Sequence, residues 1–138
     1  MILITCVDKN KGMLFNNRRQ SKDRNLIKHI CKMVKNNKIW INSFSKDLFE
    51  EQKYSNIIVD DEFINRIKEE EYCFIENISP VTLENKISKI ILYSWDREYP
   101  ADMYFNIKLE NWILESEAEI KGSSHKRITQ QIFIRGEK

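Results

Sequence analysis

The 138-residue sequence contains only three glycines, two prolines and two histidines. Three glycines are too few for either common phosphate-binding loop, because those loops need several glycines to bring the backbone close to a phosphate. Two histidines and three scattered cysteines cannot form a conventional zinc site. Cys6, Cys31 and Cys73 are odd in number and each lies in an apolar segment, which predicts three buried thiols in a reducing compartment.

Long apolar runs are also missing. The opening run from Met1 to Val7 is short and is followed at once by Asp8 and Lys9, so it does not resemble a secretory signal. No segment approaches the roughly 20 apolar residues of a membrane-spanning helix. With 41% hydrophobic and 32% charged residues, the composition predicts one globular domain over residues 1–138, located in the cytoplasm and with no membrane partner.

The small net charge of +2 conceals an uneven distribution. Residues 1–38 carry ten Lys and Arg against two carboxylates, whereas residues 39–120 carry eight against eighteen. A basic segment beside an acidic one could steer an anionic ligand toward a site. Alternatively, the two segments could form solvated faces that complement each other.

The apolar pattern predicts alternating strands and helices through the first two thirds of the chain. Ser21 is predicted to cap the first helix, with Asp23 in its first turn, after a polar loop over 15–20. A helix is also predicted over 61–70, and another begins at Ser79-Pro80 and runs to about Lys86. The predicted strands are 2–7, 38–42, 56–59, 72–75, 88–95, 103–105, 112–120 and 128–135.

Because helices intervene between the early strands and not between the last ones, the sequence predicts the α/β class. We expect a single domain with a mostly parallel central sheet flanked by helices and an antiparallel C-terminal meander.

Several segments resemble the dihydrofolate reductase family. ILITCVDKNKGM resembles its first strand and the turn into its active-site loop, and NNKIWINSFSKDLF its second strand and capped helix. YCFIENISPVTLENKISKIILYSWD resembles a later strand–helix–strand unit, and DMYFNIKLENW the segment leading to a tryptophan, with Asn106 where proline is usual. The resemblance implies a dihydrofolate reductase-like fold over nearly the whole chain.

The departures from that family concern its cofactor. The glycine pair that lets the backbone approach the cofactor pyrophosphate is replaced by Ile75-Glu76-Asn77, and the Gly-Arg-x-Thr segment is replaced by residues 42–45, which lack the arginine. Residues 60–62 place carboxylates where the family binds the 2′-phosphate. We therefore expect that the NADPH site is lost, that the chain is not an NADPH-dependent reductase, and that it uses no cofactor.

The resemblance implies a role for one carboxylate. Asp23 falls where the family places the carboxylate that holds the pterin ring, which makes it a catalytic candidate, and Tyr93 falls where the family has an assisting threonine. A carboxylate in the first turn of a helix also has a purely structural explanation, because it complements the helix dipole.

The stretch CVDKNKGMLFNNRRQSKD resembles the opening of a small bacterial family whose members sometimes carry the name ribonuclease Z. The later pieces YCFIEN, LYSWDREYPADMYF and GSSH resemble that family too. Ribonuclease Z activity requires a histidine-rich site for two metal ions, which His29 and His125 cannot supply. We therefore predict neither a metal site nor a metal-dependent nuclease.

If the fold is as predicted, polar residues gather beyond the carboxyl ends of the parallel strands, where open α/β sheets bind ligands. Paired arginines beside amides and carboxylates suit an anionic, nucleotide-like or pterin-like ligand. The alternative is a solvated loop in which the acidic groups pair with the arginines. The predicted ligand-binding residues are Asn16, Arg18, Arg19, Gln20, Asp23, Glu76, Asn77, Tyr93, Asp96 and Arg97.

A second functional hypothesis is a non-catalytic interaction module whose basic N-terminal face binds an acidic protein or RNA. Lys28, Lys32 and Lys35 lack the neighbouring aromatic residues that typically accompany RNA binding, so this hypothesis ranks below the small ligand. Ser124 and His125 are adjacent and would point to opposite sides of a strand, which argues against a nucleophile–base pair.

Overall fold

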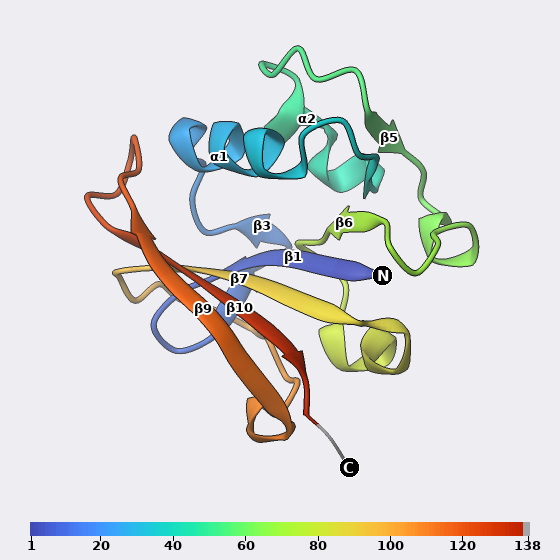
Figure 1. Ribbon diagram of the computed structural model, residues 1–138. Helices are drawn as coiled ribbons and strands as arrows, with labels where there is room; N and C mark the ends of the chain where they lie inside the picture. Colours follow the sequence, from blue (N-terminus) through green and yellow to red (C-terminus); the bar gives the residue numbers. More distant parts are fainter. Residues whose placement is uncertain (137–138) are drawn as a thin grey trace.

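A seven-stranded sheet runs through the centre of the computed structural model, which describes residues 1–136 (Figure 1). Its first five strands are parallel, and β10 pairs antiparallel with both β7 and β9. The predicted fold class is therefore confirmed. The order is β5 (Ile57–Val59), β4 (Ile39–Ile41), β6 (Tyr72–Phe74), β1 (Ile2–Val7), β7 (Lys89–Trp95), β10 (Ile128–Arg135) and β9 (Trp112–Ile120).

Short helices cover both faces of this sheet (Figure 1). The α-helices α1 (Arg24–Val34) and α2 (Lys46–Phe49) lie on one face, and η3 (Pro80–Lys86) and η4 (Leu109–Asn111), both 3-10 helices, lie on the other. Further 3-10 turns are η1 (Ser43–Ser45) and η2 (Phe63–Asn65). No helix within residues 1–136 combines the length and apolar character that a membrane crossing requires.

Two apolar clusters, one on each face, hold the layers together. Successive residues of a strand point to opposite faces, so Leu3 of β1 joins one cluster while Ile2 and Ile4 join the other. Ile27 and Ile30 of α1 pack into the same cluster as Ile4. Strands buried on both faces explain the near-continuous apolar runs in the sequence.

The helix predicted over 61–70 is wrong, because only the 3-10 turn η2 forms there. Asp60 accepts a hydrogen bond from the backbone N–H of Glu62 and pairs with the guanidinium of Arg66 at 2.7 Å. These local contacts close a tight turn around Phe63, whose side chain is fully buried. The turn therefore places the Phe63 side chain in the core without a regular helix.

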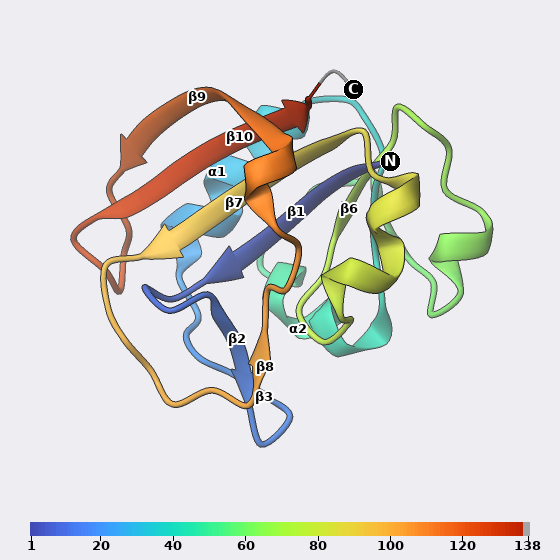
Figure 2. The ribbon, with the colours of Figure 1, turned by 90° about the horizontal axis from the view of Figure 1, so that it is seen from below.

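A second, three-stranded sheet lies beside the carboxyl end of β1, in the order β3-β2-β8 (Figure 2). It consists of β2 (Gly12–Phe15), β3 (Arg18–Arg19) and β8 (Met103–Tyr104). The polar loop predicted over 15–20 is thus partly a hairpin. Asn16 and Asn17 form its two-residue turn with φ angles of 50° and 58°, a left-handed conformation that asparagine tolerates well.

We predict that this turn controls the stability of the hairpin. Asn17→Val should lower the free energy of unfolding by about 1–2 kcal/mol, because a β-branched residue is strained at positive φ. Asn17→Gly, the matched control, should leave it within about 0.5 kcal/mol of the wild type, because glycine adopts this φ freely. Urea unfolding would measure both, and equal stability of the two variants would contradict a left-handed turn.

Candidate functional site

A buried carboxylate, Asp8, organises the loops at the end of β1. Its Oδ1 accepts hydrogen bonds from the backbone N–H groups of Asn10 and Gly12, both at 2.8 Å. Its Oδ2 accepts from the backbone N–H of Tyr99 at 3.0 Å and from Nε2 of Gln20 at 3.2 Å. Asp8 therefore joins the turn after β1, the segment after β3 and the segment after β7.

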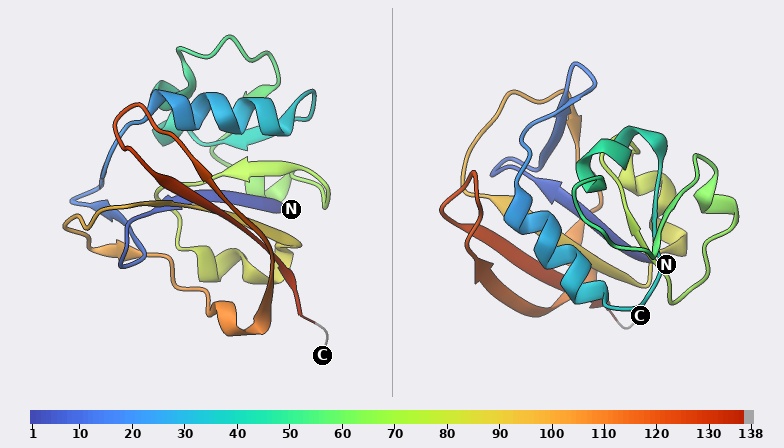
Figure 3. Two further views of the ribbon diagram at one scale, coloured as in Figure 1. Left: turned by 60° about the vertical axis from the view of Figure 1, so that its left-hand side comes forward. Right: turned by 90° about the horizontal axis from the view of Figure 1, so that it is seen from above.

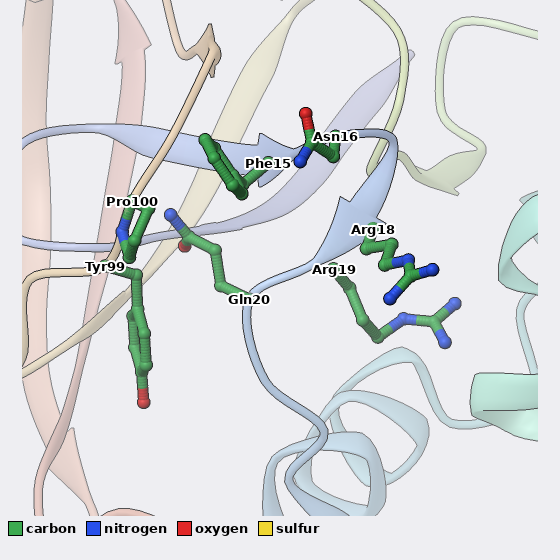
Figure 4. A pocket seen from close by; sticks show the side chains of 7 residues that line it. All are labelled: Phe15, Asn16, Arg18, Arg19, Gln20, Tyr99 and Pro100. Atoms are coloured by element: carbon green, nitrogen blue, oxygen red, sulfur yellow. The ribbon is translucent and has the colours of Figure 1, made fainter.

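These joined segments surround a cavity of about 470 Å³ (Figure 4). Gln20 is one of the residues that line it; its Oε1 is buried and has no hydrogen-bond partner within the described chain, whereas its Nε2 is held by Asp8. The cavity size lies within the range of small-molecule sites. The lining residues are Phe15, Asn16, Arg18, Arg19, Gln20, Tyr99 and Pro100.

Four of the ten predicted ligand-binding residues line this cavity: Asn16, Arg18, Arg19 and Gln20. Phe15, Tyr99 and Pro100 also line the cavity, and no signal in the sequence indicated that they would. Phe15 is 43% exposed, although it ends an apolar strand. Tyr99 and Pro100 enter the site only because Asp8 binds their segment, about ninety residues further along the chain.

The guanidinium of Arg19 extends away from the cavity into the crevice at the carboxyl ends of β4 and β6. It forms two hydrogen bonds with the carboxylate of Glu76, at 2.8 and 2.9 Å, and two with that of Asp47, at 2.9 and 3.1 Å. Glu76 also accepts from the hydroxyl of Ser45 at 2.8 Å. Hydrogen bonding to Glu76 raises the pKa of Arg19, which stays charged. The groups that surround Arg19 satisfy one another, whereas Oδ1 of the nearby Asn42 is buried without a partner in the described chain.

Asp23 is the N-cap of α1, so the prediction of Ser21 at that position is wrong. Oδ1 of Asp23 accepts from the backbone N–H of Leu26 at 3.1 Å, in extended backbone geometry at φ −121°. The same oxygen accepts from the backbone N–H of Ser123 at 2.9 Å, and Oδ2 accepts from that of Ser124 at 2.8 Å. The carboxylate of Asp23 thus accepts hydrogen bonds both from the first turn of α1 and from a distant loop, and aspartate is among the residues preferred at the N-cap.

The loop between β9 and β10 wraps so closely around Asp23 that no ligand reaches its carboxylate. A Cβ atom at Gly122 would lie 2.4 Å from Oδ2 of Asp23, so only glycine allows this approach. His125 places its Nδ1 3.4 Å from the same oxygen, stacks on Trp95, and shares a 2.8 Å hydrogen bond between its Nε2 and the hydroxyl of Tyr99. Asp23 therefore fixes the loop and, through His125, the ring of Tyr99.

The remaining predicted residues lie outside the cavity. Tyr93 is fully buried on the α1 side, where its hydroxyl accepts from Gln130 at 2.9 Å, and it forms no hydrogen bond with Asp23. Asn77 accepts from Asn42 at 2.8 Å at the crevice. Asp96 pairs with Lys9 at 3.5 Å on the surface. Arg97 lines a separate hollow together with His125.

Residues 1–136 present neither a cluster of three metal-ligating side chains nor an activated thiol. No group of three His, Cys, Asp or Glu side chains in that range could hold a metal ion. Burial raises the pKa of Cys31 to about 11 and that of Cys73 to about 12, and burial beside Glu76 and Asp23 raises the pKa of Cys6. The three thiols are free and stay protonated at neutral pH, so they are poor nucleophiles.

The sheet order, the helix placement and the antiparallel end define an α/β fold of the dihydrofolate reductase type. A solved structure of dihydrofolate reductase from Enterococcus faecalis, in complex with NADP(H) and RAB-propyl, superposes with a TM-score of 0.69. The match covers 99% of this chain and 97% of that one at 10% identity, so it shows the fold alone. No protein-family model and no curated protein matches the sequence.

The pH dependence of stability should reveal the role of Asp23. Burial alone would raise its pKa, but the hydrogen bonds from Ser123, Ser124 and Leu26 outweigh this effect and lower the pKa to about 2. Because the unfolded value is about 3.9, the carboxylate stabilises the fold above pH 4, and this stabilisation is lost as the pH falls toward 2. The loss attributable to this group should be about 2 kcal/mol.

Urea unfolding at pH 7 and between pH 4 and pH 2 would measure this contribution. Asp23→Asn should be less stable at pH 7 and should lose less free energy on acidification than the wild type. Asp96→Asn, a half-exposed control, should keep the wild-type pH dependence. An unchanged pH dependence in Asp23→Asn would contradict the anchoring role.

The two acidic partners of Arg19 should contribute unequally to the free energy of unfolding, because Glu76 is buried and Asp47 is exposed. Arg19→Ala should cost about 3 kcal/mol, because it leaves Glu76, whose side chain is 10% exposed, buried without its cation. Asp47→Ala should cost about 1 kcal/mol or less, since Asp47 is 54% exposed and its ion pair is screened by water. Urea unfolding would measure both variants.

A second substitution would test the cause. Adding Glu76→Gln to Arg19→Ala should recover part of the lost stability, because the unpaired charge is removed. Equal, small losses for Arg19→Ala and Asp47→Ala would show that the crevice pair is not buried as described.

Proposed function

We propose that this protein keeps a dihydrofolate reductase-like fold, has lost the NADPH site, and binds a small anionic, ring-containing ligand of the nucleotide type in the cavity between β3 and Tyr99. The observation that carries the proposal is the combination of an unpartnered Gln20 Oε1 with the exposed Arg18 around one cavity. A buried acceptor without a partner costs free energy unless a ligand or water donates to it.

Each wall of the cavity suits one part of such a ligand. Arg18 has no carboxylate partner among residues 1–136, so its guanidinium is available for a phosphate or carboxylate. The rings of Phe15 and Tyr99 offer apolar surfaces for a flat heterocycle. Gln20 Oε1 would accept from an N–H on the edge of that ring.

The crevice at the carboxyl ends of β4 and β6 does not suit a dinucleotide. The carboxylate of Glu76 stands where an approaching phosphate would be repelled, and a phosphate could take up Arg19 only by breaking its four hydrogen bonds to Glu76 and Asp47. Breaking a buried pair of this kind costs several kcal/mol. This geometry supports the proposed loss of NADPH binding.

The same contacts favour binding over catalysis by Asp23. Its carboxylate is 1% exposed and fully engaged by the loop between β9 and β10, so it supports a structural role. The hydroxyl of Tyr99 is held by the buried His125, which in turn contacts Asp23, so these groups fix the position of the Tyr99 ring at the cavity.

Thermal unfolding with added ligands would test the proposal directly. The melting temperature would be measured with each of the four nucleoside monophosphates, with folate and with NADPH. We expect at least one monophosphate to raise the melting temperature and NADPH to leave it unchanged. A ligand present at 100 times its Kd stabilises the native state by about 2.7 kcal/mol. Arg18→Gln should abolish the shift, and Lys108→Gln, which removes one exposed positive charge outside the cavity, should retain it.

Three results would overturn the proposal. A shift with NADPH would show that the crevice opens to a dinucleotide. A monophosphate shift that survives Arg18→Gln would place the ligand elsewhere. No shift with any nucleotide or folate would mean that the cavity is not a site for this class.

A further inference from the structure

The solvent side of α1 carries a regular stripe of positive charge. Arg24, Lys28 and Lys32 follow one another at intervals of four residues and are all exposed. Residues four apart lie on the same side of a helix, about 6 Å apart along its axis. Leu26, Ile27, Ile30 and Val34 turn the opposite side toward the sheet, so the cations point to solvent.

The loop between β9 and β10 extends this stripe with residues from the other end of the chain. Because Asp23 binds the backbone of Ser123, Ser124 and His125, the tip of this loop lies beside the start of α1 (Figure 1 and Figure 3, right). Both views show the two segments side by side. We call the combined surface the basic face: Lys22, Arg24, Lys28, Lys32, Lys126 and Arg127.

Three hollows are distributed over the basic face. The first, of about 230 Å³, lies between Lys22, Arg24 and the two serines of the loop, and the second, of about 380 Å³, lies between Lys28, Lys32 and the segment after α2. The third, of about 400 Å³, is bordered by Arg97, Lys126 and Arg127. The second hollow combines three lysines, Lys53 included, with neutral hydrogen-bonding groups, which suits phosphate oxygens. The first and third each contain one carboxylate, Glu51 and Asp96, beside their two or three cations.

The cations of the basic face are nearly free of internal partners. Within residues 1–136, only Arg127 among them pairs with a carboxylate, that of Glu119 at 3.7 Å, and both of these side chains are more than half exposed. An exposed pair at this distance is weak. The face can therefore exchange its counterions for an external polyanion without breaking stable contacts.

The surroundings favour a nucleic acid over an acidic protein as the partner. Protein interfaces depend on a few large apolar or aromatic side chains at their centre. The exposed large hydrophobic residues of this protein lie outside the basic face. They are Phe15, Val59, Val81, Tyr104, Ile113 and Leu114.

The lack of stacking surfaces favours a duplex over a single strand. Proteins that bind single strands stack the bases on exposed aromatic rings. Of the aromatic side chains beside the hollows, His125 is buried on Trp95, and Tyr54 is only partly exposed and is held through its hydroxyl by the carbonyl oxygens of Lys35 and Asn37. Phosphate contacts without base stacking are typical of duplex recognition by shape.

We propose that the basic face binds the phosphate backbone of double-stranded nucleic acid, independently of base sequence and separately from the cavity. Fluorescence anisotropy with a labelled 20-base-pair RNA duplex and the matching DNA duplex, from low to physiological salt, would test this. We expect log Kd to rise linearly with log salt, with a slope that reflects the number of phosphates contacted.

A pair of charge-matched variants locates the interaction. Arg24→Gln combined with Lys28→Gln and Lys32→Gln should weaken binding at least tenfold and reduce the salt slope by about 2–3, because each lost phosphate contact reduces it by about 0.9. Glutamine is well tolerated in helices, so this variant should fold, as circular dichroism would verify. Lys46→Gln combined with Lys68→Gln and Lys108→Gln removes the same charge from exposed positions elsewhere and should bind like the wild type.

Four outcomes would overturn the proposal. The absence of binding to either duplex at low salt would contradict the proposed interaction. Equal weakening by the two variants would show that binding depends on the net charge of the protein and not on the basic face. Tighter binding of a single-stranded RNA than of the duplex would contradict the argument from stacking. Equally tight binding of poly-glutamate would show that the face takes any polyanion.

Discussion

The buried carboxylate of Asp23 is the interaction on which the rest of the structure depends. Its two oxygens cap α1 and bind three successive backbone N–H groups of the loop between β9 and β10. Through His125 the same loop holds the hydroxyl of Tyr99, which lines the cavity. One side chain therefore connects the first helix, the last hairpin and the wall of the candidate site.

Asp8 and Glu76 use the same principle at other points. A buried carboxylate is stable only when donors surround it, and each of these two recruits donors from segments far apart in sequence. As a result, Arg19 and Glu76 are paired with each other at the carboxyl ends of β4 and β6. Within the described chain, Gln20 Oε1 and Arg18 at the neighbouring cavity and most cations of the basic face have no internal partner, and we propose ligand binding at these two places.

The prediction of the fold succeeded where a strand is marked by its own apolar and β-branched residues. Strands 2–7, 112–120 and 128–135 have the predicted bounds, because their apolar residues or their pairing partners leave little choice of register. Prediction failed where short polar contacts decide. The helix predicted over 61–70 is absent because Asp60 closes a turn there. The N-cap of α1 is Asp23 and not Ser21. The loop at 15–20 is partly a hairpin because two asparagines accept positive φ angles.

Composition, periodicity and adjacency along the chain were enough to predict the α/β class, the burial of Cys31 and Cys73, and the cluster of Asn16, Arg18, Arg19 and Gln20, whereas Cys6 is only partly buried. Which charges are paired internally follows from the packing of distant segments. Whether Arg19 binds a ligand or Glu76, and whether Asp23 faces a cavity or a loop, depends on partners 57 and about 100 residues away. Such pairings arise from the packing of the sheet, and no local pattern encodes them.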